Sequence, residues 1–371
     1  MEECITYWQN RLNKKNKLIT LEFPGYSLAY EHTNSKSVIS LITPVFNGES
    51  FLNDIFGCIS KQTISEKVEW IIVDDGSTDH SLEKACALAE ENNSRIGTIK
   101  IYSLDKNTGG GYALQFAVER TAAKYVAWMS VDDLYVSDDK LEADYEILSK
   151  NDVQLVFSNY IWQGSDLDHL AYKISMDEDI KNMITSKGNR ASKLAFLLIY
   201  MPLNSSSAVY SKEALIKIGN FDTINISCDA DTIYKAILSN YNIAFDDRIC
   251  FYRLHVNQVS KNTWIMLIGT NVMQLRILSL LDELSIEDEF LYWINQFHIK
   301  FSSYYYNRLL LSYFLFKKYG DKLNNFPEEI ISQCEGNYTT EDFKNMVIFA
   351  RELRTTKSFS QFLLNLTPEL V

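Results

Sequence analysis

Short apolar runs alternate with amphipathic stretches between residues 37 and 133. The runs are rich in β-branched side chains, and the stretches carry apolar residues at helical spacing, as Leu52, Ile55 and Ile59 do. The expected strands are residues 37–46, 68–75, 98–104 and 124–133. Strands that alternate with helices in this way predict an α/β fold: a Rossmann-like, mostly parallel sheet flanked by helices on both faces.

Each expected strand ends on polar or glycine-rich sequence: TPVFN, DDGSTD, DKNTGGG and SVDD. Carboxyl ends of parallel strands meet at one edge of the sheet, where ligands bind in such folds. Asp132 and Asp133 end the fourth strand, and adjacent carboxylates repel each other unless a cation or hydrogen-bond donors stabilise them. Two explanations stay open from the residues alone, a turn or helix cap and a metal site.

Beyond residue 133 the pattern predicts strands near 152–163 and 243–255, with a helix at 228–240 between them. The chain after residue 264 has helical spacing almost throughout. We therefore expect three parts: an N-terminal helical extension and linker (1–36), an α/β domain (37–262) and a C-terminal helical subdomain (263–371).

Charge and composition narrow the class of protein. The net charge is −12 and the pI about 5.0, which argues against a nucleic-acid partner. Six scattered cysteines predict reduced thiols rather than a disulfide framework. The N-terminus has no signal-peptide pattern, and no run of about 18 apolar residues predicts a transmembrane segment. These features indicate a cytoplasmic protein and leave peripheral contact with a membrane open.

Five segments, in order, resemble family 2 glycosyltransferases of the GT-A fold. They are SLITPVFNGESFL, WIIVDDGSTD, NTGGGYALQFAVERTAAKYVAWMSVDD, IGNFD with CDADTIYKA, and YRLHVNQVS. The resemblance spans roughly residues 38–262. It implies an inverting enzyme that transfers a sugar from a nucleotide-diphosphate donor, most simply a UDP-sugar, with Mn²⁺ or Mg²⁺ as cofactor.

The resemblance implies a metal and diphosphate site around the paired aspartates. Asp133 is expected to bind the metal, and Asp132 to lie beside the ribose or the metal. His255 is expected as a third metal ligand or phosphate donor, and Arg253 as a phosphate partner; the alternatives are a packed structural histidine and an ion pair with a carboxylate. Many relatives carry a further Asp at the position of Ser130, so the donor site departs from the commonest pattern here.

The resemblance also implies a nucleotide site on the first three strand ends. Asp75 is expected to accept the N–H of a uracil ring, and Pro44 and Phe46 to flank the base. Asn107 and Gly109 belong to a glycine-rich turn that lets the chain approach the donor. The structural alternatives are a helix cap for Asp75, a core position for Phe46 and a flexible turn for residues 107–111.

Asp229 is expected to be the general base that takes the proton of the acceptor hydroxyl. Relatives usually carry Glu before this Asp, whereas this chain has Cys228, and Asp231 is expected only to start the helix. The acceptor is expected to be a glycan, lipid-linked glycan, protein or small molecule. Two alternatives remain: a non-catalytic nucleotide-sugar-binding relative, and a nucleotidyltransferase, which would need a basic, glycine-rich loop after the first strand.

Overall fold

The computed structural model describes residues 25–34, 36–150, 152–164, 172–174, 178–199, 201, 203–223, 228–258, 263–305, 315 and 317–323. Its strands are β1 (Tyr26–Thr33), β2 (Ile39–Val45), β3 (Val68–Asp74), β4 (Thr98–Leu104), β5 (Tyr125–Trp128), β6 (Leu134–Tyr135), β7 (Leu155–Gly164), β8 (Tyr172–Ile174), β9 (Val209–Ser211) and β10 (Ile243–Leu254). Its α-helices are α2 (Leu52–Ser60), α3 (Ser81–Asn92), α4 (Gly110–Arg120), α5 (Lys140–Lys150), α6 (Glu178–Thr185), α7 (Arg190–Ile199), α8 (Lys212–Lys217), α9 (Cys228–Leu238), α10 (Thr263–Leu278) and α11 (Glu287–Tyr305). Three 3₁₀ turns, η1 (Ser65–Lys67), η2 (Ser205–Ser207) and η5 (Gly320–Lys322), complete the described elements.

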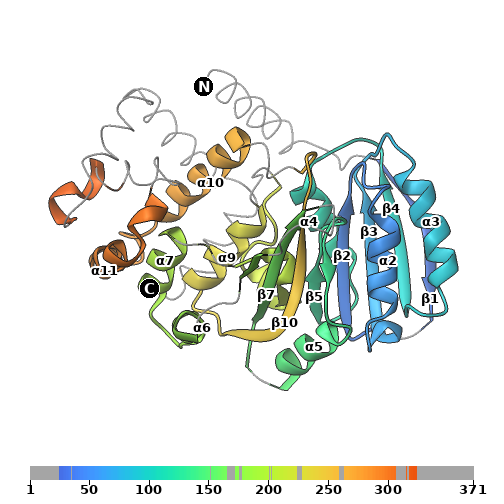
Figure 1. Ribbon diagram of the computed structural model, residues 1–371, viewed down its shortest axis with the longest axis horizontal. Helices are drawn as coiled ribbons and strands as arrows, with labels where there is room; N and C mark the ends of the chain where they lie inside the picture. The colour runs from blue at the N-terminus through green and yellow to red at the C-terminus, as the bar shows by residue number, and fades with distance from the viewer. Residues whose placement is uncertain are drawn as a thin grey trace.

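The strands form one mixed sheet in the order β1-β4-β3-β2-β5-β9-β7-β10-β6, and β8 pairs with β7. Strands β2, β3, β4 and β5 are parallel to one another, and β7 and β10 run the same way because β5 and β7 are both antiparallel to β9. After the edge strand β1, the chain passes to β2 in the middle of the sheet and then adds strands on both sides of it, with β3 on one side and β5 on the other (Figure 1). This reversal is where open α/β sheets bind ligands. The predicted α/β class is confirmed.

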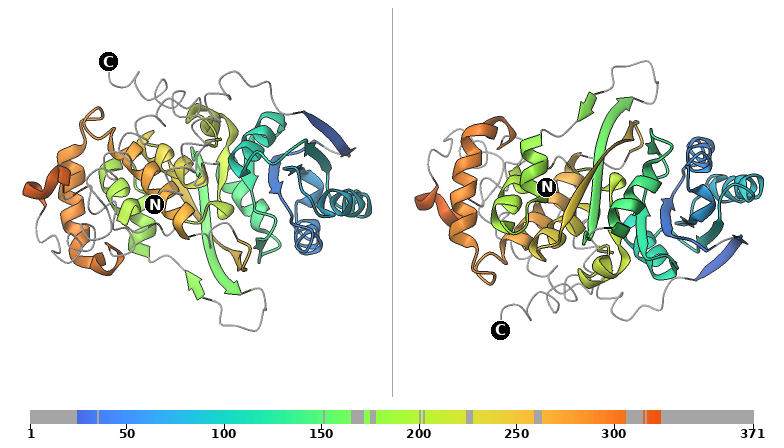
Figure 2. Two further views of the ribbon diagram at one scale, coloured as in Figure 1. Left: turned by 90° about the horizontal axis from the view of Figure 1, so that it is seen from above. Right: turned by 90° about the horizontal axis from the view of Figure 1, so that it is seen from below.

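Helices cover both faces of the sheet, as Figure 2 shows from two sides. Alternate residues of β2 and β3 divide between two apolar clusters: Ile42 and Ile71 pack with α4, α7 and α9, whereas Leu41 and Trp70 pack with α2, α3 and α5. Both faces of these strands are therefore buried, which explains why β3 reads as one continuous apolar run. Such a sheet offers a ligand its edge rather than a face.

Strand β1 lies within residues 1–36, the stretch predicted to be a helical extension and linker. It pairs antiparallel with β4 at the edge of the sheet, but most of its side chains are exposed, including Tyr26 and Leu28 at 49% and 47%. Backbone hydrogen bonds rather than an apolar face hold this strand, so the sequence pattern lacks the alternation that predicts one. Residues 1–24, where the helical extension was predicted, lie outside the described residues.

The C-terminal helices α10 and α11 share a core with the sheet. Apolar residues such as Ile277 and Leu291 belong to the same buried cluster as Leu194 of α7 and Ile237 of α9. Figure 1 shows α7, α9, α10 and α11 grouped beside β7 and β10, at the opposite end of the sheet from α3. No helix in the described part of the chain is long and apolar enough to cross a membrane. Residues 324–371 lie outside the described residues.

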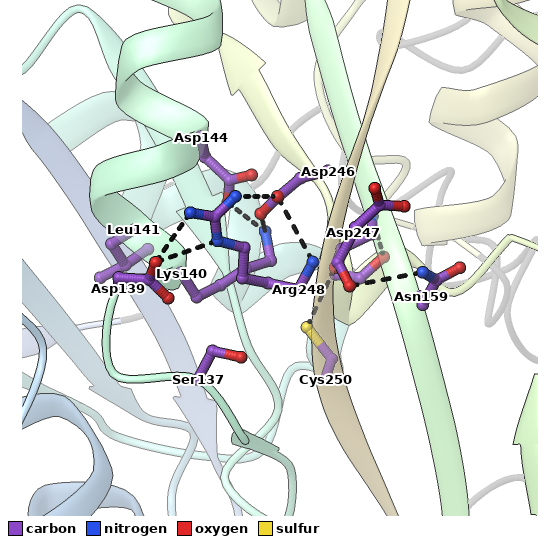
Figure 3. A network of polar contacts seen from close by, with 12 residues as sticks. Ser137, Asp139, Lys140, Leu141, Asp144, Asn159, Asp246, Asp247, Arg248 and Cys250 are labelled. Carbon is purple, nitrogen blue, oxygen red and sulfur yellow. Dashed lines mark hydrogen bonds and ion pairs between the residues drawn. The ribbon is translucent and has the colours of Figure 1, made fainter. Parts of the chain in front are cut away.

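An ionic network fixes α5 against β10 (Figure 3). Lys140 and Asp144, both fully buried, form an ion pair within the first turns of α5, and Lys140 Nζ also lies 4.0 Å from Asp246 Oδ2. Arg248 bridges Asp246 and Asp139, with N–O distances of 2.9 and 2.7 Å. The irregular register of β10 begins at Asp246. The network therefore holds the segment after the paired aspartates against the strand that ends at the site.

Candidate functional site

The carboxylate of Asp75 organises the edge of the sheet beyond β3. Its Oδ1 accepts hydrogen bonds from the backbone N–H and the hydroxyl of Thr108, at 2.7 and 2.6 Å, and its Oδ2 accepts the N–H of Gly109 at 2.8 Å. Burial raises the pKa of Asp75, and these hydrogen bonds oppose the rise. Asp75 therefore holds the glycine-rich loop, a role that the predictions for these residues did not include.

Close backbone contacts require glycine in this region. Gly109 has a φ of 96°, in the range that favours glycine, and directly precedes α4. Gly76 has a φ of 67°, and a Cβ there would lie 2.5 Å from the carbonyl carbon of Lys106. The loops after β3 and β4 are thus packed together, with the predicted donor residue Asn107 exposed between them.

The loop after β2 borders the same edge. Pro44 is half-buried and Phe46 is 47% exposed, so the core alternative for Phe46 is not what the structure shows. Asn47 adopts a φ of 51°, and its Oδ1 accepts the backbone N–H of Thr78 at 2.8 Å. Asn47 therefore shapes the loop, which leaves the exposed Phe46 ring beside the end of the strand.

Asp132 is held by two side chains. Its Oδ1 accepts a hydrogen bond from the Ser130 hydroxyl, and its Oδ2 lies 2.8 Å from Nε2 of His255. The His255 ring also contacts Phe51 at 4.9 Å between centroids. Ser130 thus acts as a hydrogen-bond donor to the neighbouring carboxylate, whereas an aspartate there would repel it.

Asp133 is the more deeply buried of the pair. Its Oδ1 accepts the backbone N–H of Arg253 at 3.2 Å, and the Ser206 hydroxyl also hydrogen-bonds this carboxylate. Its Oδ2 is buried with no hydrogen-bond partner. Burial, and next the neighbouring Asp132 charge, raise the pKa of Asp133 well above its ordinary value. A buried carboxylate oxygen without a donor suits a cation or a proton.

The side chains of Asp132, Asp133 and His255 provide part of the predicted metal site. Carboxylate and imidazole donors match Mn²⁺ or Mg²⁺ together with phosphate oxygens, and the lone Oδ2 of Asp133 fits a ligand position. His255, however, contacts Asp132 and not Asp133. Over the described ranges, no group of three or more His, Cys, Asp or Glu side chains is placed to hold a metal ion. These side chains therefore fit a site in which phosphate oxygens supply some of the metal ligands better than a site in which the protein supplies all of them.

The guanidinium of Arg253 is engaged with protein groups. Nη2 pairs with Oδ2 of Asp54 at 2.7 Å, and Nε donates to the backbone oxygen of Asp132 at 3.1 Å. This is the carboxylate pairing that the sequence left as the alternative to a phosphate contact. Asp54 is half exposed, so solvent screens its pair with Arg253.

Asp229 lies in the first turn of α9. Burial raises the pKa of its carboxyl, while the N–H of Ala230 and the hydroxyl of Ser205 donate hydrogen bonds that lower it. A raised pKa brings a carboxylate closer to the range in which it accepts protons usefully near neutral pH. The neighbouring Asp231 is fully buried and paired with Lys235 at 2.6 Å, which agrees with its expected structural role.

Two sets of site-supporting residues went unnoticed in the sequence. Arg276 of α10 is fully buried and forms ion pairs with Asp231 and with Asp222, the latter at 2.7 Å. Ser205 and Ser206 of η2 contact Asp229 and Asp133. The asparagine-serine cluster NSSS was a usable signal, because such clusters favour capped turns. An arginine in an apolar helical stretch was a signal for a buried partner.

The fold is that of the GT-A glycosyltransferases. TarS 1–349 of S. aureus in complex with UDP-GlcNAc has this fold at a TM-score of 0.53 and 13% identity, over 85% of this chain and 91% of that one. Mannosyltransferase PcManGT from Pyrobaculum calidifontis in complex with GDP-Man and Mn²⁺ matches at a TM-score of 0.50 and 14% identity, over 98% and 95%. These two likenesses establish the fold.

Sequence comparison gives the family. Residues 40–219 match the model of glycosyl transferase family 2. TuaG of Bacillus subtilis (strain 168), a glycosyltransferase named for teichuronic acid biosynthesis, is 30% identical over 158 residues, which are 41% of this chain and 60% of TuaG. Another relative, an uncharacterized glycosyltransferase of Haemophilus influenzae, is likewise matched over only 62% of its length. The chain therefore carries a family 2 glycosyltransferase domain, and the suspected family is confirmed.

Proposed function

We propose that the chain is an inverting glycosyltransferase that moves a sugar from a nucleotide-diphosphate donor, a UDP-sugar, to an acceptor hydroxyl. The observation that carries this proposal is the placement of two carboxylates with different surroundings at one sheet edge. Asp133 presents a buried Oδ2 without a donor, and Asp229 lies at the start of α9 with a raised pKa. One can serve the diphosphate and the other the acceptor.

The nucleotide is proposed to bind along the ends of β2, β3 and β4. Phe46 offers an exposed aromatic face for a base, and Pro44 fixes the shape of the loop. Asp75 holds the loop of Asn107 and Gly109, and its Oδ2, which accepts a single hydrogen bond, has a second lone pair that could accept the N–H of a uracil ring. TarS was crystallised with UDP-GlcNAc and PcManGT with GDP-Man and Mn²⁺, which supports a nucleotide-sugar donor of this general kind.

The diphosphate is proposed to lie beside the paired aspartates. Asp133, with Asp132 and His255 next to it, would hold Mn²⁺ or Mg²⁺ together with phosphate oxygens, and the ion would neutralise charge on the leaving diphosphate. Arg253 can exchange Asp54 for a phosphate at the same place. Ser130 keeps Asp132 oriented, which explains how the site manages without the additional Asp.

The transfer is a single displacement. The acceptor oxygen attacks the anomeric carbon as Asp229 takes its proton, and the bond from that carbon to the β-phosphate oxygen breaks. The nucleoside diphosphate leaves with the bonding electrons, and the configuration at the anomeric carbon inverts. The acceptor would be a glycan, lipid-linked glycan, protein or small molecule, and the cytoplasmic location and peripheral membrane contact stay predictions.

Replacement of each carboxylate tests the division of roles. Asp229→Asn should keep UDP binding in the presence of Mn²⁺, measured by calorimetry, and lose at least about 10²-fold in UDP-sugar turnover. Asp133→Asn should lose the dependence of UDP binding on Mn²⁺. Asp288→Asn, the same chemical change at a carboxylate that is 92% exposed, is the matched control.

Two results would decide against this proposal. If the wild-type protein neither binds UDP with Mn²⁺ nor hydrolyses any sugar of a UDP-sugar panel, the donor assignment is wrong. If it binds UDP but Asp229→Asn leaves turnover of every active donor unchanged, Asp229 is not the base. Binding without any turnover would favour the non-catalytic alternative.

A further inference from the structure

The 3₁₀ turn η2 lies between the two carboxylates because of the direction of β9. That strand runs antiparallel between β5 and β7, so its first residue, Val209, pairs with Ala127 near the carboxyl end of β5. The residues just before β9 therefore lie at the same edge of the sheet as Asp133. Ser205, Ser206 and Ser207 are all buried there, with at most 5% of each exposed.

Consecutive serines of this turn contact different carboxylates. The Ser205 hydroxyl hydrogen-bonds the carboxylate of Asp229, and the Ser206 hydroxyl that of Asp133. The two carboxylates come from distant parts of the chain, the end of β5 and the start of α9. A single peptide unit thus connects the residue proposed for the diphosphate side to the residue proposed for the acceptor side.

The turn itself is strongly fixed. Oδ1 of Asn204 accepts the N–H of Ser206 at 2.8 Å, and the N–H of Ala208 donates to the Ser205 oxygen at 2.9 Å. Ser207 donates its hydroxyl to the Asn204 backbone oxygen at 2.6 Å. Because these local hydrogen bonds fix the backbone of the turn, the hydroxyls of Ser205 and Ser206 have little freedom to move relative to each other.

A second connection ties β9 to the first turn of α9. The hydroxyl of Tyr210 lies 2.8 Å from Oγ1 of Thr232. The Thr232 hydroxyl in turn donates a hydrogen bond to the backbone oxygen of Asp229 at 2.6 Å. The Ser205 hydroxyl therefore holds the side chain of Asp229 directly, and Tyr210 of β9 supports its backbone through Thr232. A helix start that was merely packed on the sheet would not need this pair of polar contacts.

We propose that Ser205 and Ser206 are positioning residues that set the distance and orientation between the acceptor-side base Asp229 and the diphosphate-side carboxylate Asp133. This inference rests on the proposed function of those two carboxylates and extends it to the turn that joins them. Neither serine exchanges a proton or touches the sugar in this role. Each hydroxyl donates one hydrogen bond and fixes one acceptor.

Ser205→Ala should act on the base. Loss of a hydrogen bond to a charged carboxylate should lower kcat for UDP-sugar hydrolysis roughly ten- to hundredfold. In the plot of kcat against pH, the acidic limb should move up by about one pH unit, because the hydrogen bond from Ser205 lowers the pKa of Asp229. The charged neighbour of Asp229, Asp231, is unchanged in this variant. Ser205→Thr keeps the hydroxyl and should restore most of both properties.

Ser206→Ala should act on the diphosphate side of the site, through Asp133. It should weaken binding of UDP in the presence of Mn²⁺ by roughly tenfold, measured by calorimetry without any turnover, and leave the acidic limb where it is. Ser207→Ala is the matched control, since that hydroxyl lies in the same turn and contacts only backbone groups of Asn204 and Ser158. Its kcat, acidic limb and UDP affinity should equal those of the wild type.

Thermal unfolding of every variant separates positioning from loss of structure. The inference is overturned if Ser205→Ala and Ser206→Ala change the same property, or if neither differs from Ser207→Ala while the wild type is active. It is also overturned if the effects track the unfolding midpoint alone and Ser205→Thr restores nothing. A wild type that neither binds UDP with Mn²⁺ nor turns over a donor would instead refute the proposed function, so the two failures are distinguishable.

Discussion

Arg276→Met should be among the most destabilising single changes in the described part of the chain. Arg276 joins Asp222 to Asp231, and Asp231 also pairs with Lys235; all four side chains are fully buried. Removal of Arg276 takes away the cation that two buried carboxylates share. Breaking a buried pair in this way costs about 3–5 kcal/mol, because the uncompensated charge stays out of water.

The loss should depend on pH with a defined sign. Without Arg276, the charged form of the buried Asp222 carboxylate loses a stabilising cation, whereas its protonated form does not need one. The loss of stability is therefore expected to be smaller at low pH, where the carboxylate can take up a proton, and larger at high pH. Arg276→Met combined with Asp222→Asn should recover part of the loss, since one buried negative charge is then absent.

Urea unfolding at pH 5 and pH 8 measures these effects. Lys217→Met is the control, because Lys217 and its partner Glu213 are 59% and 75% exposed, and such surface pairs contribute at most about 1 kcal/mol. A loss below about 1 kcal/mol at pH 8 for Arg276→Met would refute the view that this cluster ties α10 to α9. Turnover should fall as well, because Asp231 lies in the same helical turn as Asp229.

Three further expectations follow from local geometry. Gly111→Ala would place a Cβ 2.2 Å from the backbone oxygen of Asp222, more than 1 Å short of normal contact, and should cost about 1–3 kcal/mol in thermal unfolding; no measurable loss would show that the backbone there is free to shift. Asp75→Asn would turn an amide toward N–H donors of the glycine-rich loop, so we expect a loss of about 1–3 kcal/mol and weaker UDP binding, and unchanged binding and stability would contradict it. Burial raises the pKa of Asp144 to about 6, so its contribution to stability should fall as the pH rises from about 4 to 6; the stability of the wild type relative to Asp144→Asn should decline across that window, and a flat difference would oppose this.

The sequence determined the sheet and the edge that carries the chemistry. Continuous apolar runs predicted β2, β3, β4 and β5, and the polar residues that follow them predicted where they would converge. This works because parallel strands buried on both faces need unbroken apolar sequence, and because all their carboxyl ends point the same way. The same logic failed for β1, which backbone pairing holds with mostly exposed side chains.

Only the tertiary structure decided how the carboxylates are held. Ser205 and Ser206 reach Asp229 and Asp133 because β9 runs against its neighbours, and Arg276 meets Asp231 because α10 packs behind α9. Hydrogen bonds and buried ion pairs join residues far apart in the chain, and no local periodicity records them. Hydrophobic patterning is a property of neighbouring residues and can be read along the chain, whereas polar satisfaction is a property of the assembled fold.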